Sequence, residues 1–265
     1  MIFSCFFRDK QEIFVTFAAE NKKNMVVAAK VKDVLNTTPD GVVLTIQDFD
    51  IVPKNQPTLT RYLNLLVARD VLKKVSKGRY YKPRKTQFGL LSPSTSEVVK
   101  DFLQKGGKTK GYITGATAFA EMGLTTQISS SIMIGTNKYR SPITRNGIKI
   151  SFLAQLNPIT PKSIPLLRIL DALKLIRRIP GSTPGETIIV IKKLVASLSP
   201  KQQKSLVTYA MKYQPAVRAM LGAILEDLGA NKLAAPLSKT LSGVTAYKLG
   251  ISSKILPTTK NWNIL

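Results

Sequence analysis

The sequence contains no histidine, a single cysteine (Cys5), and only 15 acidic residues among 265. Without histidine the chain lacks the usual general base, the commonest metal ligand and every Ser–His or Cys–His nucleophile. One cysteine excludes an intrachain disulfide and a cysteine zinc site, so we expect a reducing, cytoplasmic setting. These absences predict a protein that is not an enzyme and holds no metal or cofactor.

Long apolar runs are missing too, and acids are outnumbered by bases. No segment approaches the roughly 18–20 apolar residues of a membrane span. The N-terminal MIFSCFF lacks the charged start and cleavage site of a signal peptide. Lys and Arg number 40, which gives a formal charge of +25. Because this charge is not confined to one helix or tail, it favours a nucleic acid over a membrane surface as partner.

Composition and the positions of turn-forming residues predict that the chain has two domains. With 44% apolar residues it can bury real cores. We predict an α+β fold, mostly helical with small β elements: a winged helix-turn-helix domain at 22–90 and an effector domain at 91–265. The latter would hold an α+β element at 91–160 with a small central sheet, and a helical part at 161–265. For residues 1–21 two interpretations stay open, a poorly ordered extension or a stretch upstream of a true start at Met25.

The most informative segment is PTLTRYLNLLVARDVLKKVSKGRYYKP, residues 57–83. Leucine recurs there at helical spacing, which predicts an amphipathic helix from Thr58 to about Arg69. Asp70 then makes a sharp turn, and a strand–turn–strand follows with its tip at 76–78. From 72 to 85 there are seven basic residues and no acid. A helix able to enter a major groove, followed by a basic β-ribbon, is the outline of a winged helix-turn-helix.

Candidate DNA contacts lie on both parts of this segment. Arg61 and Asn64, one turn apart, are the first choice for base contacts, because such side chains reach base edges. For any single residue the alternative is a solvated helix face. The base-contact set is Gln56, Thr58, Thr60, Arg61 and Asn64. The backbone or wing set, which would add affinity and salt dependence, is Lys73, Lys74, Lys77, Arg79 and Lys82. Of the adjacent tyrosines, Tyr80 should face inward and Tyr81 outward.

Helix-capping residues and the positions of glycine and proline predict the remaining helices and strands. Before the predicted recognition helix we expect helices at 25–35 and from Ile46, and after the wing a linker at 84–93. Next should come a helix capped by Ser94 or Ser96 that runs to Gln104, and a short helix capped by Thr114 that runs to Met122 and is stopped by Gly123. Strands are expected at 128–136 and 148–153. Helices from Ser163, from a capping box at Thr183 and from Ser199 should fill the C-terminal third.

Two motifs resemble enzyme sites, but each lacks a part that the enzyme pattern requires. Asp48 and Asp50 resemble the metal-binding pair of nucleotidyltransferases, but the Gly-Ser turn that should precede them is absent. We expect them to be solvated or capping residues. Gly106-Gly107-Lys108-Thr109 ends like a phosphate-binding loop, yet Phe102 stands where that pattern needs glycine, and a helix is predicted before it.

Two segments resemble a known family. The run from Leu59 to Pro83 is similar to the winged helix of AbiEi-type antitoxins from type IV toxin–antitoxin systems. YITGATAFAEMGLTTQ, from Tyr112 to Gln127, resembles the block that follows the wing in a subset of that family, and it is the more specific of the two. One departure is Asp70, where the family generally has glycine, which can alter the wing's approach angle.

The resemblance implies a transcriptional regulator that represses its own operon by binding operator repeats in double-stranded DNA. It also implies antitoxin activity, carried beyond the winged helix, against a nucleotidyltransferase-like toxin in abortive phage defence. A stable complex with that toxin is not required. The alternatives are a basic RNA-binding or ribosome-associated protein, and a metal-dependent nuclease or transferase that uses Asp48 or Asp50. The operator sequence and the oligomeric state do not follow from the sequence.

Overall fold

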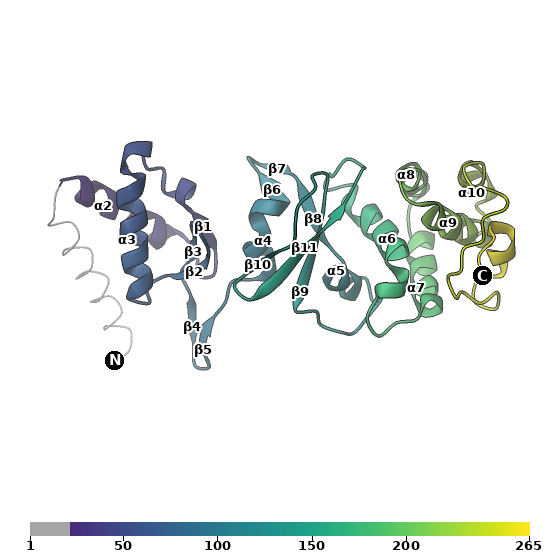
Figure 1. Cartoon of the computed structure of the whole chain (residues 1–265), viewed down its shortest axis with the longest axis horizontal. Helices are drawn as coiled ribbons and strands as arrows, with labels where there is room; N and C mark the ends of the chain where they lie inside the picture. Colours follow the sequence, from purple (N-terminus) through teal and green to yellow (C-terminus); the bar gives the residue numbers. More distant parts are fainter. Residues whose placement is uncertain (1–21) are drawn as a thin grey trace. The chain divides into compact units, whose positions relative to one another are not determined.

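A computed structural model describes residues 22–265 of the chain (Figure 1). Both interpretations of residues 1–21 therefore concern residues outside the described part. The chain divides into two compact units, the first reaching Lys100 and including Arg145–Gly147, the second comprising Asp101–Thr144 and Ile148–Leu265. The division falls beyond the boundary expected at residue 90. Helices alternate with small sheets, so the fold is α+β, as predicted.

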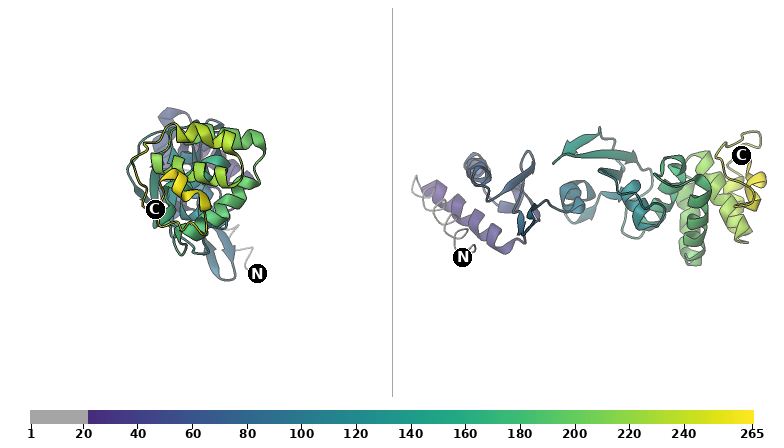
Figure 2. Two further views of the ribbon diagram at one scale, coloured as in Figure 1. Left: turned by 90° about the vertical axis from the view of Figure 1, so that its right-hand side faces the viewer. Right: turned by 90° about the horizontal axis from the view of Figure 1, so that it is seen from below.

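The first unit has the element order of a winged helix-turn-helix. Its strands form a three-stranded antiparallel sheet in the order β1-β3-β2. In Figure 2 (right) α3 is seen end-on while α2 runs across the view, so the two helices cross steeply. The elements are α2 (Lys22–Thr37), β1 (Val43–Thr45), η1 (Ile46–Phe49), η2 (Pro53–Asn55), α3 (Gln56–Ala68), β2 (Lys73–Ser76) and β3 (Arg79–Tyr81).

The second helix of this motif is shortened to the 3-10 turn η1. Asp48 accepts hydrogen bonds from the N–H and hydroxyl of Thr45, at 2.6 and 2.8 Å, and so begins the turn. Asp50 ends it by adopting a left-handed conformation with φ 46°. The helix expected from Ile46 thus exists only as one capped turn, and Asp48 has the capping role expected of it.

The core of the first unit lies between α2, α3 and one face of the sheet. Leu59, Leu63 and Leu66 of α3 are all buried there, as their spacing predicts. Tyr80 joins them at 1% exposure, so its predicted inward orientation is confirmed. The outward orientation predicted for Tyr81 is wrong, because this side chain is only 6% exposed. Both faces of the sheet are therefore covered at β3.

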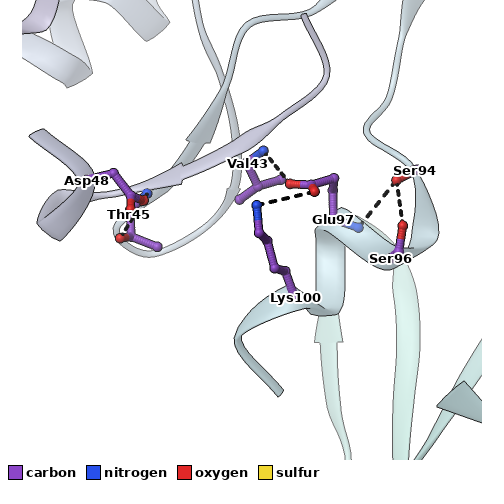
Figure 3. A network of polar contacts seen from close by, with 7 residues as sticks. All are labelled: Val43, Thr45, Asp48, Ser94, Ser96, Glu97 and Lys100. Carbon is purple, nitrogen blue, oxygen red and sulfur yellow. Dashed lines mark hydrogen bonds and ion pairs between the residues drawn. The ribbon is translucent and has the colours of Figure 1, made fainter. Parts of the chain in front are cut away.

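The helix α4 (Thr95–Leu103) reaches the side of the sheet on which Tyr81 lies. Strand alternation puts Tyr81 on the side of its cross-strand neighbour Val43, which is also buried. The Val43 N–H donates to the carboxylate of Glu97 in α4 at 3.0 Å (Figure 3). The Ser94 hydroxyl accepts the Glu97 N–H at 3.3 Å and caps this helix. Val98 and Val99 of α4 are also buried.

Residues 84–93, predicted to be a linker, instead contain a β-hairpin, which we call the second hairpin. Its strands β4 (Arg84–Thr86) and β5 (Gly89–Leu91) pair antiparallel around the turn Gln87-Phe88. The Thr86 hydroxyl donates to the Gly89 carbonyl at 3.0 Å and accepts the Phe88 N–H at 3.3 Å, which closes the turn. Figure 1 shows this hairpin projecting from the body of the first unit.

The second unit contains a four-stranded mixed sheet in the order β10-β11-β9-β8. β9 and β11 are parallel, while β8 is antiparallel to β9. Asn146-Gly147, which cluster with the first unit, turn the chain between β10 and β11 with positive φ at both residues. The strands and neighbouring elements are β6 (Gln104–Lys105), β7 (Lys108–Thr109), β8 (Gly111–Thr114), α5 (Ala116–Glu121), β9 (Ser131–Thr136), β10 (Ile143–Arg145) and β11 (Ile148–Ala154).

Helices make up the rest of the second unit. The central one, α9, is buried along most of its length and contacts α6, α8, α10 and η4. The capping box at Thr183 is confirmed: its hydroxyl accepts the Glu186 N–H at 3.3 Å, and Glu186 accepts the Thr183 N–H at 2.7 Å. The helices are α6 (Ile164–Lys174), η3 (Ile176–Arg178), α7 (Pro184–Ala196), α8 (Pro200–Ala210), α9 (Pro215–Asp227), α10 (Asn231–Ser238) and η4 (Pro257–Trp262). Within residues 22–265 no helix is both long and apolar enough to cross a bilayer.

The turn at Asp70 offers a test of the local backbone. Asp70 has φ 58°, a left-handed conformation that costs an ordinary L-residue about 1–2 kcal/mol. Asp70→Gly and Asp70→Ala both remove the ion pair with Lys73, so the energy of that ion pair does not affect the difference in stability between the two variants. We expect the glycine variant to be more stable than the alanine variant by about 1 kcal/mol in urea unfolding. Equal stabilities would contradict the left-handed turn.

Candidate nucleic-acid interface

Outside its leucine stripe, α3 carries polar side chains, which we call the outer stripe: Gln56, Thr60, Arg61 and Asn64. Gln56, Thr60 and Asn64 are spaced by four residues and so lie on one side of the helix, with Arg61 adjoining. Gln56, Arg61 and Asn64 are exposed, whereas Thr60 is half-buried and its hydroxyl donates to the Gln56 carbonyl at 3.0 Å. Thr58, also among the predicted base contacts, is half-buried. Three of the five side chains thus reach solvent fully.

Tyr80 links the wing, residues Lys73–Tyr81, to the outer stripe. Its hydroxyl donates to Asn64 Oδ1 at 3.5 Å, the long limit of a hydrogen bond. Burial raises the pKa of Tyr80, so the phenol keeps its proton and remains a donor. Because the Asn64 oxygen accepts from Tyr80, the NH₂ group of the amide is the part left to act as a donor. This is the group that would hydrogen-bond an acceptor on a base edge.

The basic residues of the wing differ in their surroundings. Lys74 and Lys77 are exposed, and the Lys74 ammonium lies 5.6 Å from the centre of the Tyr80 ring. Lys77 sits at the tip beside Gly78, whose φ of 71° allows the tight turn. Lys73 and Arg79 are half-buried: Lys73 pairs with Asp70 at 2.5 Å, and Arg79 donates to the Ser76 hydroxyl at 3.4 Å. Lys74 and Lys77 are therefore the wing cations most open to a polyanion.

Lys82 has a different environment from the other predicted wing contacts. Its ammonium pairs with Asp40 at 2.7 Å and donates to the carbonyls of Leu35 and Thr38 at 3.3 Å each. These carbonyls belong to the C-terminal end of α2 and its exit, where a cation is favourable. Burial lowers the pKa of Lys82. Because the side chain ties β3 to α2, we leave Lys82 out of the proposed DNA-facing set.

Acidic groups are scarce around the wing. Between Asp70 and Glu97 the sequence has no acid and seven basic residues. The two acids at the ends of this stretch are both engaged, Asp70 with Lys73 and Glu97 with Lys100 and the Val43 N–H. The stretch therefore carries a positive potential that attracts phosphates. Asp50, half of the pair that resembles a catalytic site, lies 3.3 Å from Lys30.

A second polar cluster, absent from the sequence-based predictions, lies inside the second unit. The carboxylate of Asp171 in α6 is 0% exposed and accepts hydrogen bonds from three hydroxyls: Tyr112 at 2.6 Å, Thr114 at 2.9 Å and Tyr213 at 2.8 Å. Gln155 in turn donates to Tyr112 and Tyr213. Burial raises the pKa of Asp171, and the three hydroxyls oppose that shift by stabilising the carboxylate. The cluster links β8 to α6 and to the end of α8.

Thr114 shows why this cluster escaped prediction. Thr114 was expected to cap α5. In the structure it is the last residue of β8, and Gly115 takes the N-cap position instead. A side chain at Gly115 would meet Met133, with its Cβ only 2.8 Å from the Met133 Cβ. One sequence signal was present: Asp171 is the sole acid in the otherwise apolar and basic helix IPLLRILDALK.

Comparison with known proteins places the chain in a family. Residues 30–164, just over half of the chain, match DUF6088, a family of unknown function. The chain belongs to DUF6088. The matched region of this DUF6088 protein runs from α2 through the wing and the second hairpin to the start of α6.

Two further comparisons add little. The chain is similar to the crystal structure of the Rv2827c protein from Mycobacterium tuberculosis, with 16% sequence identity, 84% of each chain covered and a TM-score of 0.45. A likeness of that size supports no functional argument. No curated protein matches the chain.

The position of Lys82 predicts a loss of stability on substitution. Lys82→Ala removes two long hydrogen bonds, at 3.3 Å each, and an ion pair with Asp40, whose 41% exposed side chain stays in contact with water when the pair is lost. We expect the free energy of unfolding to fall by about 2 kcal/mol in denaturant titrations. Lys77→Ala, at the exposed wing tip, is the matched control and should change stability by less than about 0.5 kcal/mol. Equal effects of the two changes would contradict the structural role of Lys82.

Proposed function

We propose that this DUF6088 protein is a sequence-specific DNA-binding repressor of its own operon that also acts as an antitoxin. The observation that carries the DNA-binding part is the exposure of Gln56, Arg61 and Asn64 in the outer stripe of α3, next to a wing and a following stretch that contain no acid. A helix of this kind fits the major groove, which is wide enough to admit it and displays a distinct pattern for each base pair. The protein needs no cofactor for this function.

The proposal assigns different tasks to the outer stripe and to the wing. Arg61 would pair with guanine, because its guanidinium matches two acceptors on that base, and Asn64 would pair with adenine. Lys74 and Lys77 would contact phosphates, with Lys73 and Arg79 supporting them from half-buried positions. Phosphate contacts release counterions and raise the affinity for every sequence alike. Base contacts supply the preference for an operator.

The antitoxin part rests on the resemblance of residues 112–127 to a block in AbiEi-type antitoxins. In the structure much of this block serves the fold: Tyr112 and Thr114 hold Asp171, and Phe119 is buried. Residues that counteract a nucleotidyltransferase-like toxin would therefore be sought among exposed side chains of the second unit. The proposal requires functional antagonism of such a toxin and not a stable complex.

One observation favours the alternative, a basic RNA-binding protein. Tyr139 is exposed between Lys138 and Arg140 in the loop after β9, which is a typical setting for stacking an unpaired base. Duplex DNA and a structured RNA of equal length would compete for the full chain at physiological salt. If the chain prefers the RNA and Tyr139→Ala loses RNA binding, the RNA-binding alternative is favoured over the DNA-binding hypothesis.

The division of tasks predicts two kinds of binding defect. On a duplex selected by the wild-type chain from a random-sequence pool, Arg61→Ala should weaken binding by about 1–3 kcal/mol and relax the preference at one base position. Lys74→Ala should weaken binding to all sequences equally and reduce the slope of log K against log salt by about one. Fluorescence anisotropy across a salt series measures both quantities.

The control for this pair is Lys201→Ala, an exposed lysine in the second unit at the start of α8. It should leave the affinity, the base preference and the salt slope of the operator complex unchanged. If Arg61→Ala and Lys74→Ala also leave all three unchanged, the assignment of α3 and the wing to DNA is wrong.

The antitoxin activity predicts a genetic result. Co-expression of the full chain should restore growth of cells that produce a nucleotidyltransferase-like toxin from the neighbouring reading frame. Arg61→Ala should still restore growth from a heterologous promoter, because the outer stripe serves DNA and not the toxin. Colony counts measure both. Failure of the wild-type chain to restore growth would leave a repressor without antitoxin activity.

A further inference from the structure

The second hairpin exposes an aromatic side chain at its tip. Phe88 occupies the two-residue turn between β4 and β5 and is 91% exposed. Its backbone is held firmly, since the Thr86 hydroxyl bonds to both the Phe88 N–H and the Gly89 carbonyl. Almost none of the apolar surface of this side chain is removed from water, so it contributes little to the stability of the folded chain. The Phe88 ring is therefore open to contact with a ligand.

The strands behind the tip carry one cation and one half-exposed leucine on each face. Arg84 pairs across the hairpin with Leu91, and Lys85 pairs with Leu90. Because side chains alternate along a strand, one face carries Arg84 and the other carries Lys85. The hairpin lies within the acid-free stretch between Asp70 and Glu97. An apolar tip with a cation on either side suits a ligand in which stacked bases lie between negatively charged phosphates.

We propose that the second hairpin is a second DNA contact, in which Phe88 enters the minor groove as an apolar wedge while Arg84 and Lys85 bind the flanking phosphates. Proteins that bind the minor groove often insert such a side chain between base steps, partly unstacking them and bending the duplex. This inference rests on the proposed DNA-binding function and extends it. The operator would be held by α3 and the wing at one place and deformed by Phe88 at another.

A second copy of the chain fits this hairpin less well. Stable protein interfaces bury about 800 Å² on each partner, and a hairpin of three-residue strands offers far less. Symmetric pairing of two second hairpins would also bring Arg84 and Lys85 of both copies together with no acid between them. A wedge needs only one side chain and gains from the same cations. Charge and size both favour the duplex.

The test uses the full chain and the duplex selected by the wild type, with 2-aminopurine at successive adenine positions. Wild type should raise the fluorescence at one step, because unstacking removes quenching there, and should bend the duplex. Phe88→Ala should bind on the order of tenfold more weakly and lose the fluorescence rise and the bend. Phe88→Trp should retain both. Ile128→Ala, at an apolar residue of the second unit with 99% exposure, is the matched control and should behave like wild type.

The outcomes separate this inference from the proposed function. If wild type binds, Arg61→Ala weakens the complex and Phe88→Ala matches wild type in affinity, fluorescence and bend, the wedge is overturned while DNA binding stands. If wild type binds no duplex, both fail. Sedimentation velocity measures the oligomeric state of the two proteins. A dimer present in wild type and lost in Phe88→Ala would show that the second hairpin binds a second copy of the chain instead of DNA. The melting temperature of Phe88→Ala should equal that of wild type, since an exposed side chain contributes little to the fold.

Discussion

Burial of Leu59, Leu63 and Leu66 sets the rotation of α3 about its own axis, and the character of the first unit follows from it. Each leucine is nearly or fully excluded from water, and removing one from a core typically costs about 2–5 kcal/mol. The helix therefore cannot turn to hide Arg61 or Asn64 without exposing the leucines. Tyr80 extends the constraint to the wing, because its ring is buried in the same core while its hydroxyl reaches Asn64. Helix and wing are thus held in one fixed relation.

The second unit is organised around a polar centre. Asp171 has no water contact, and its carboxylate is satisfied by hydroxyls from β8 and from the segment after α8. Such a network is stabilising only when every member is in place, because an unpaired buried carboxylate is costly. It therefore selects one packing of the sheet against the helices among the many that an apolar contact would tolerate. The residues that resemble an antitoxin block lie at this point for that structural reason.

Features set by neighbouring residues could be predicted from the sequence. The leucine stripe of α3, the positive φ of Asp70 and Gly78, and the capping boxes at Asp48 and Thr183 all depend on side chains within a few positions. Features that depend on distant segments could not. Tyr81 lies on the side of the sheet where Glu97 of α4 bonds to β1, and Lys82 is held by carbonyls of α2 and its exit, neither of which leaves a local pattern. The second hairpin was missed because strands of three residues are too short to display alternation.

The first unit is continuous in space but interrupted along the chain. It includes Arg145–Gly147, and the buried Arg145 guanidinium donates to the Val98 carbonyl at 3.0 Å. A fragment that stops after the wing would lose the Glu97 carboxylate that accepts the Val43 N–H, and one that stops at Lys100 would still lack the Arg145 guanidinium. Expressing the winged helix as a separate domain would therefore require Arg145–Gly147 as well as the residues up to Lys100.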